Sequence, residues 1–558
     1  MSTFPRLLLD TYRQTPDQVA LTLLLSGQQD QPITFRQLVE GAHQWAKKLE
    51  RAGILPGEVV VLILQHGLDL VYAYWGTILY GGIPSILPFL TEKLLPERYR
   101  SDLAALVAIT KPASIITYRQ FEPEVRASLP ENCSVRQVMI SEDVHATQEV
   151  CLHDFHGLER KPEDIVLLQH SSGTTGLQKG VALSHQAVLN QLESYSLALK
   201  INAEDVIVSW LPLYHDMGLI AGFLMPILLR VPLVLLSPFD WVRSPVRLFQ
   251  AVKKYHGTLS WLPNFAYNFC AQKIRDRELE DIDLSSWRAI SNCSEPMRFE
   301  SHQAFLARFS KYGLKESALC SCYAMAENVF AVTQGGISSP VLIDEVDRES
   351  LQNNNYALPR KGVSSSLKMV SAGLPINNVS IRVLDPHGNS LPDRNVGEFA
   401  FKSNCMLTDY YHRADATKKA IQRGWYLTGD MGYLLDGQVF IAGRKKDMII
   451  VGGKNIFPMD LEELAMEVSG VHAGRVVAFG VFNEETGTED VVIVAEVDTP
   501  EEKEREIIGD MIRQTVTRGS AVALRHVYLV DALWLIKTSS GKTARGANKE
   551  KYLKEITF

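Results

Sequence analysis

Short apolar segments alternate with helical ones through roughly the first 330 residues of the chain. Continuous apolar runs, with the length and composition of buried strands, occur at residues 59–64, 114–118, 206–210 and 233–236. Segments of helical character lie between them, as at residues 70–80 and 245–255. Because parallel strands need long crossover connections, this alternation predicts an α/β fold of parallel sheets covered by helices.

The pattern changes near residue 370. Short strands with alternating polarity are predicted at residues 380–385, 397–401 and 438–441, with Gly, Asp and Pro in the turns. They indicate an antiparallel sheet or a small β-barrel-like subdomain over about residues 370–443. A basic joint then leads to an α+β segment, with strands predicted at residues 475–482 and 490–497 and a helix at 502–516. We therefore expect an N-terminal domain over residues 1–443 and a smaller C-terminal domain over residues 448–558.

One polar segment interrupts these patterns. Residues 335–368 contain runs of three asparagines and three serines and show no clear periodicity. The prediction is a long irregular loop, which is either functional or mobile.

Composition narrows the class of protein. A chain of 558 residues exceeds one hydrophobic core, which agrees with two or more domains. The net charge of −7 gives no electrostatic reason to expect a nucleic-acid partner. The seven cysteines lack CxxC spacing, so a disulfide framework or zinc site is not expected and a reducing cytoplasm fits best.

A single stretch has the length of a membrane span. Residues 219–237 are strongly apolar, but Arg230 lies in the middle and Pro226 and Pro232 interrupt the run. An arginine at mid-bilayer costs roughly 2.5–3.5 kcal/mol even on lenient scales. We expect a buried helix, a turn and a strand instead. The N-terminus lacks the features of a secretory signal, so we expect a soluble, cytoplasmic protein without a membrane span.

The strongest candidate for chemistry follows the apolar run at residues 165–168. Residues 170–180 read HSSGTTGLQKG, with glycines, hydroxyl side chains and Lys179. Glycines let the backbone approach a ligand, and hydroxyl and amide groups bind anions, so the stretch predicts a phosphate-binding loop; the alternative is a plain flexible turn. It is not a Walker A motif, because Gln178 precedes Lys179 and Gly180 follows it.

The loop resembles the phosphate loop of the adenylate-forming enzymes, which include acyl-CoA synthetases, luciferases and nonribosomal adenylation domains. It departs from that pattern at Gln178, where proline is usual. Further stretches that resemble the family's motifs follow in the family's order: WLPLYHDMG at residues 210–218, SNCSEP at 291–296, CYAMAE at 322–327, WYLTGD at 425–430, GRKKD at 443–447 and KTSSGK at 537–542. Ala324 replaces the usual glycine, and Ile536 replaces a common proline.

The resemblance implies an ATP site. Its phosphate contacts would come from Ser171, Ser172, Gly173, Thr174, Thr175, Gly176 and Lys179. Further nucleotide contacts would come from Ser294, Glu295, Pro296, Tyr323, Ala324, Met325, Asp430, Arg444 and Lys542. Among these, Tyr323 would stack on adenine, Asp430 would bind the ribose hydroxyls, and Arg444 would touch ribose and phosphate. Glu327 and Thr175 would ligate Mg²⁺, a hard cation that prefers oxygen ligands.

The resemblance also implies catalytic roles, for Lys542, His215, Lys179 and Glu327. Lys542 would bridge the attacking carboxylate and the α-phosphate, and His215 would lie beside that carboxylate. Residues 444–447 would form a hinge with Lys446 as its pivot, about which the C-terminal domain rotates.

The implied reaction converts a carboxylic acid and ATP to acyl-AMP and pyrophosphate, followed by acyl transfer to a phosphopantetheine thiol. Residues 237–258, 261–274 and 283–296 resemble those of fatty acyl-AMP ligases. The surplus at residues 341–367 matches an insertion in those enzymes that is thought to hinder the domain swing that admits CoA. That branch implies a fatty or related apolar acid and an acyl carrier protein. The alternatives are an acyl-CoA or aryl-CoA ligase that uses free CoA, and a catalytically idle relative. Candidate walls of the acid pocket are Phe239, Trp241, Trp261, Phe265 and Tyr267.

Overall fold

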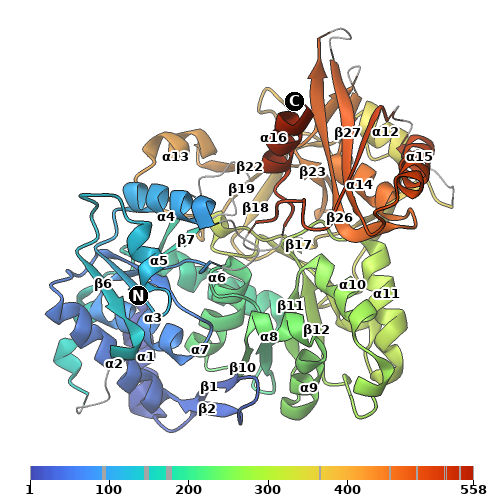
Figure 1. Ribbon diagram of the computed structural model, residues 1–558. Coiled ribbons are helices and arrows are strands. Elements are labelled where there is room, and N and C mark those ends of the chain that lie inside the picture. The colour runs from blue at the N-terminus through green and yellow to red at the C-terminus, as the bar shows by residue number, and fades with distance from the viewer. Residues whose placement is uncertain are drawn as a thin grey trace.

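Figure 1 shows the computed structural model, in which a large N-terminal part carries a smaller C-terminal part on one side. The structure describes residues 2–90, 96–143, 150–170, 179–362, 366–451, 454–484, 488–520, 522, 524–538 and 542–556.

A first seven-stranded sheet runs in the order β13-β12-β11-β9-β10-β1-β2. Its strands are β1 (Val19–Leu24), β2 (Gln31–Thr34), β9 (Ile207–Ser209), β10 (Leu233–Leu236), β11 (Leu259–Leu262), β12 (Ala289–Asn292) and β13 (Leu319–Ser321). All neighbours are parallel except the β1–β2 pair. The helices between them are α8 (Pro238–Arg243), α9 (Val246–Tyr255), α10 (Asn264–Lys273) and α11 (Phe299–Phe309).

A second seven-stranded sheet runs in the order β20-β8-β7-β4-β3-β5-β6. Its strands are β3 (Val59–Ile63), β4 (Ile83–Ile86), β5 (Ser114–Thr117), β6 (Gln137–Ile140), β7 (Ile165–His170), β8 (Gly180–Ser184) and β20 (Asp409–Tyr410). The associated helices are α2 (Phe35–Arg51), α3 (Leu68–Tyr80), α4 (Pro96–Thr110), α5 (Glu122–Ala127) and α6 (His185–Leu199).

Alternate residues of β3 face two different cores. Val60 and Leu62 belong to the large core that the two sheets share with α2 and α3, whereas Val61 packs on the other face with α4. Strands buried on both faces read as continuous apolar runs, which is why the sequence signalled them clearly. The predicted parallel sheets covered by helices are confirmed.

The apolar stretch at residues 219–237 is also as predicted. The helical residues Met217–Leu224 continue into α7 (Met225–Leu229), Arg230 turns the chain with φ 61°, and β10 follows. In the described part of the chain, no helix has both the length and the apolar character to cross a membrane.

A smaller antiparallel sheet follows the two parallel ones. It contains β18 (Ser380–Leu384), β19 (Gly397–Lys402), β21 (Ile421–Gln422), β22 (Trp425–Leu435) and β23 (Gln438–Arg444). A two-residue turn joins β22 to β23, with Asp436 at φ 50° and Gly437 at φ 76°. This turn geometry matches the natural twist of a hairpin, and it fixes Asp430 directly opposite Arg444.

The prediction of an irregular loop over residues 335–368 was wrong for much of that segment. It contains β15 (Ile343–Asp347), which pairs with β16 (Ser366–Val370), and the short helix α12 (Arg348–Asn353). Val346 and Leu351 are buried in a cluster with Tyr433 and Phe440 of the small sheet. A few apolar residues anchor a mostly polar segment, so its periodicity is too weak to read from sequence.

The C-terminal part is an α+β unit around β26 (Val471–Asn483), β27 (Thr488–Val497) and β28 (His526–Val530). The hairpin β24 (Ile449–Val451) and β25 (Lys454–Ile456) precedes it, and α14 (Pro458–Met466), α15 (Glu502–Ser520) and α16 (Arg545–Ile556) surround it. Separate apolar clusters cover the two faces of this sheet. The boundary at residues 443–448 and the hinge there stay predictions.

Candidate active site

The motif residues of the N-terminal part lie where parallel strands end. His215 follows β9, Ser294 follows β12 and Tyr323 follows β13, and these strands belong to one sheet. Open α/β sheets bind ligands at the carboxyl ends of their strands, so this edge is the expected place for a site. The strand β7 of the second sheet ends at residue 170, where the predicted phosphate loop begins.

Of the predicted phosphate loop, the structure describes residues 170, 179 and 180. Ser171, Ser172, Gly173, Thr174, Thr175 and Gly176 lie outside the described residues. Lys179 is described, and its ammonium lies 4.5 Å from the centre of the Tyr410 ring. Tyr410 belongs to β20, which pairs with β8 immediately after the loop. A cation over an aromatic face is held electrostatically, so Tyr410 fixes the direction of the lysine.

The same tyrosine contacts the predicted metal ligand. Its hydroxyl donates a hydrogen bond to Oε1 of Glu327 at 2.7 Å, and it lies 2.9 Å from the hydroxyl of Tyr426. No group of three or more metal-ligating side chains occurs among the described residues. Mg²⁺ needs fewer, because it is commonly held by one or two carboxylates together with phosphate oxygens and water. Glu327 and Lys179 both contact Tyr410, and a carboxylate with a nearby ammonium fits a Mg²⁺–phosphate site.

A second group of predicted residues forms a polar cluster, in which Tyr323 and Asp430 are buried and Arg444 is exposed. The Tyr323 hydroxyl donates to Oδ2 of Asp430 at 2.6 Å, and Nε of Arg444 lies 3.3 Å from Oδ1 of the same carboxylate. Burial, with Asp430 as a second cause, raises the pKa of the Tyr323 hydroxyl well above its usual range. Asp430 raises the pKa of Arg444 most strongly and Glu327 adds to this, so the two clusters share one electrostatic environment.

The C-terminal part contributes Lys542 to this environment. Burial and the nearby Arg444 lower the pKa of the Lys542 ammonium, while Glu295 and Asp216 oppose the shift. Although burial raises the pKa of Asp216, the adjacent His215 and Lys542 bring it below its usual value. Nδ1 of His215 lies 2.6 Å from Oδ1 of Asp216, and the charge of Lys542 acts on the same carboxylate.

The turn after β12 is strained. Ser294 has φ 68°, a left-handed conformation that is uncommon for a residue with a side chain. Glu295 accepts a hydrogen bond from the Phe265 amide at 3.0 Å, which ties the turn to α10, and Pro296 is exposed. Strain of the kind seen at Ser294 is concentrated at functional sites.

Ala324 and Met325 follow Tyr323 and are partly buried.

Two of the five candidate pocket residues have structural explanations. Nε1 of Trp261 donates to the Tyr195 hydroxyl at 2.8 Å, and the Tyr267 hydroxyl donates to the Ile290 carbonyl at 3.0 Å, so both belong to the core. Trp241 stacks on Trp210 of the histidine motif, with ring centroids 3.5 Å apart. Phe265 packs against Trp241, and Phe239 is partly exposed. These three stay candidates for the acid pocket.

Lys446 lies in the connection between β23 and β24 and is exposed. In the same connection, Asp447 accepts a hydrogen bond from Arg545 at 3.0 Å. The pivot role of Lys446 stays a prediction.

Sequence reasoning missed Tyr410 and Tyr426 as members of the site. Tyr426 stands inside the WYLTGD stretch, but Tyr410 lies outside every motif that the sequence suggested. The sequence pattern around Tyr410 is weak, because β20 is only two residues long and joins the second sheet from a distant part of the chain.

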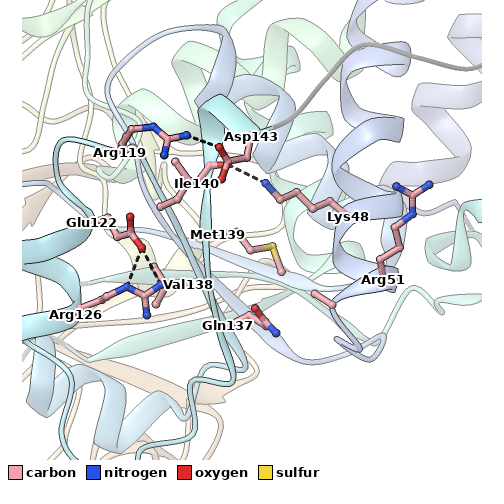
Figure 2. A pocket seen from close by; sticks show the side chains of 11 residues that line it. Lys48, Arg51, Arg119, Glu122, Arg126, Gln137, Val138, Met139, Ile140 and Asp143 are labelled. Atoms are coloured by element: carbon pink, nitrogen blue, oxygen red, sulfur yellow. Dashed lines mark hydrogen bonds and ion pairs between the residues drawn. The ribbon is translucent and has the colours of Figure 1, made fainter.

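A surface groove lies away from these motifs (Figure 2). It is lined by α2, α5 and β6, and its charged side chains include Lys48, Arg119 and Arg126. Arg126 pairs with Glu122 at 2.8 Å, Arg119 pairs with Asp143, and Lys48 donates to the Ile140 carbonyl at 2.8 Å. Because these three basic groups are paired within the groove, it offers no site comparable to the motif clusters.

Comparison with known proteins identifies the family of this chain. The family model of AMP-binding enzymes matches residues 8–411. The chain belongs to the AMP-binding enzyme family. The resemblance in the sequence is thereby confirmed, and the chain is a ligase of the acyl-AMP ligase and acyl-CoA synthetase type.

Similar proteins span nearly the whole chain. The medium-chain-fatty-acid–[acyl-carrier-protein] ligase JamA of Moorena producens is 28% identical over 96% of this chain and 92% of its own. The probable long-chain-fatty-acid–AMP ligase FadD30 of Mycobacterium tuberculosis is 30% identical over 87% of this chain and 86% of its own. A solved structure from a study of fatty acyl-adenylate ligases from E. coli and L. pneumophila has a TM-score of 0.88 at 26% identity, covering 100% of this chain and 98% of that one.

Replacing Tyr410 with phenylalanine tests its place in the candidate site. The substitution keeps the ring beneath Lys179 but removes the hydrogen bond to Glu327. We expect the Mg²⁺ concentration for half-maximal activity to rise by roughly 10-fold, the effect of losing one bond to a charged group. Replacement with leucine also removes the ring and should raise the KM for ATP as well. If both variants retain the wild-type Mg²⁺ and ATP dependence, Tyr410 does not organise the site.

Proposed function

We propose that this AMP-binding enzyme activates a fatty or related apolar carboxylic acid. The acid and ATP form acyl-AMP and pyrophosphate, and the acyl group then passes to a phosphopantetheine thiol with release of AMP. The proposed acceptor is an acyl carrier protein.

One observation supports this proposal most strongly. Lys179, Glu327, Asp430 and Arg444 come from distant parts of the chain. Tyr410 contacts both Lys179 and Glu327, Asp430 pairs with Arg444, and the charge of Arg444 acts on Lys542 of the C-terminal part. This combination suits a nucleoside triphosphate and a carboxylate substrate. The cations can bind phosphates, one carboxylate side chain can ligate Mg²⁺, and another can bind the ribose hydroxyls.

In the first step, a carboxylate oxygen attacks the α-phosphorus of ATP and pyrophosphate leaves. Bound Mg²⁺, held by Glu327 and Thr175, would neutralise charge on the phosphates. Negative charge grows on the oxygens around the reacting phosphorus, so the fixed cation of Lys542 lowers the barrier. Lys179 holds the departing phosphates, and Asp430 and Arg444 orient the ribose. Asp216 pairs with His215 and would orient it toward the carboxylate of the substrate.

In the second step, the thiol sulfur forms a bond to the acyl carbon, the thiol loses its proton, and AMP leaves. The relatives named above favour a carrier-protein thiol: JamA is described as a ligase for an acyl carrier protein. The segment at residues 341–367 adds a structural argument. Its Val346 and Leu351 share a buried cluster with Phe457, and Nδ2 of Asn455 donates to Oδ1 of Asn355 at 3.2 Å. The segment thus ties the N-terminal part to the start of the C-terminal part.

A product assay with competing acceptors tests the proposal. The enzyme is given ATP, carboxylic acids of increasing chain length, and equal concentrations of holo acyl carrier protein and CoA. We expect acyl-AMP formation with fatty acids and acyl transfer mainly to the carrier protein. Predominant CoA thioester would favour the acyl-CoA ligase alternative and contradict the proposed acceptor.

Shortening the insertion tests its proposed restraint of the C-terminal part. Asp347 and Ser366 are the last paired residues of the β15–β16 hairpin, so residues 348–365 can be replaced by Asn-Gly, a favoured hairpin turn. We expect CoA thioester formation to rise on the order of 10-fold, a typical size for coupling between two states. Pyrophosphate exchange by the same variant is the control for an intact site. A variant that exchanges normally but forms no more CoA thioester would leave the insertion without this function.

A further inference from the structure

An ion pair joins the nucleotide edge of the first sheet to the C-terminal part. Arg298 lies two residues beyond Pro296, just before α11. Its Nη1 is 2.7 Å from Oε2 of Glu463 and 3.9 Å from Oδ1 of Asp460, and both acids belong to α14. The side chains of Arg298 and Glu463 are only 22% and 27% exposed. The pair is therefore partly shielded from water, which strengthens it relative to an exposed pair.

The helix α14 is also connected to the loop that carries Lys542. Arg545 follows Lys542 by three residues, and its Nη2 donates to Oε1 of Glu462 at 2.6 Å. Nε of Arg545 donates to the Ala478 carbonyl at 2.8 Å. Arg298 pairs with Glu463 of α14, and the adjacent Glu462 accepts a hydrogen bond from Arg545 in the segment that follows Lys542. The contacts form a continuous path from the turn after β12 to Lys542.

We propose that Arg298 is a positioning residue, which holds α14 through Glu463 so that Lys542 stays in the active site during acyl-AMP formation. This inference rests on the proposed adenylation function. In this proposal Arg298 contacts neither ATP nor the carboxylic acid. Its effect passes through α14 and Arg545 to Lys542.

The surroundings of Glu463 make this contact sensitive to charge. Burial raises the pKa of Glu463, Asp460 and Glu300 add to the rise, and Arg298 and Arg348 oppose it. An acidic residue at position 298 would place another carboxylate in this group, and repulsion would separate α14 from the N-terminal part. The backbone N–H of Arg298 donates a hydrogen bond to Oδ1 of Asn264 at 3.1 Å. A substitution of the Arg298 side chain leaves this bond intact.

The test compares Arg298→Glu, Glu463→Arg and the double variant in two assays. One assay is acid-dependent pyrophosphate exchange, which reports adenylation, and the other is thiol transfer from supplied acyl-AMP. We expect each single variant to lose exchange on the order of 10-fold or more, within the usual range for coupling between sites. Transfer should fall much less, and the double variant should recover exchange because the opposite charges face each other again.

Arg308→Glu is the matched control. Arg308 lies on α11 with a side chain 23% exposed, but its partner Asp276, at 2.6 Å, belongs to the same N-terminal part. This variant should retain exchange. If Arg298→Glu does not fold, Arg298→Met and Glu463→Gln remove the pair without adding a charge and should give the same selective loss.

The outcomes separate two failures. Wild-type enzyme that exchanges no pyrophosphate with any acid would overturn the proposed function itself. Wild-type enzyme that exchanges normally, with foldable variants that either exchange equally well or lose both steps together, would overturn the positioning role of Arg298.

Discussion

Replacing Lys542 with alanine is expected to slow acyl-AMP formation by about 100- to 1,000-fold, the cost of removing one preorganised charge from a transition state. The lysine belongs to the C-terminal part, and the charges of Asp216, Glu295 and Arg444 of the preceding part act on it. Its ammonium stabilises the negative charge that grows on the phosphate oxygens in the transition state of adenylation. That transition state is bypassed when acyl-AMP is supplied. Thiol transfer from supplied acyl-AMP should therefore change much less.

Pyrophosphate exchange and single-turnover transfer measure the two steps separately. Lys537→Ala is the matched control, because Lys537 lies in the same loop but donates to the Gly474 carbonyl within the C-terminal part. The control should keep both activities. Equal losses in both steps for Lys542→Ala would contradict the assigned role.

Replacing Asp430 with alanine is expected to weaken ATP binding by about 10- to 100-fold, since hydrogen bonds to a charged group contribute about 1.5–3 kcal/mol each. The variant loses the proposed ribose contacts and also leaves Arg444 and the Tyr323 hydroxyl without their shared carboxylate. Calorimetric titration with ATP measures the change directly.

An asparagine at the same position gives a graded comparison. Asp430→Asn keeps one acceptor oxygen but no charge, so its ATP affinity should fall between those of wild type and alanine. Binding of the carboxylic acid alone should be nearly unchanged in both variants. An unaltered ATP affinity in Asp430→Ala would exclude the ribose contact.

The parts of the fold that the sequence predicted well are those with strong local signals. Runs such as residues 59–64 and 233–236 are buried on both faces, so their apolar character is continuous. The motif at residues 425–430 lies on β22, whose tight turn into β23 brings Asp430 opposite Arg444. Local periodicity was sufficient for the buried strands, whereas the motif was recognised by its resemblance to the family.

The missed features depend on contacts between distant residues. Tyr410 reaches Glu327 and Lys179 from a two-residue strand, and the partner of Arg298 lies on α14. Polar pairs of this kind leave no periodic pattern. The segment at residues 335–368 was misjudged for a related reason, because its order comes from burial of Val346 and Leu351 against the small sheet.

Acid-dependent exchange of labelled pyrophosphate into ATP tests the central claim most directly, because it needs ATP, an acid and Lys542 at one site. The account predicts exchange that requires Mg²⁺ and an added carboxylic acid, is greatest with fatty acids, and is almost abolished in Lys542→Ala. Absence of exchange with every acid, in a protein that still binds ATP, would contradict it and favour the catalytically idle alternative.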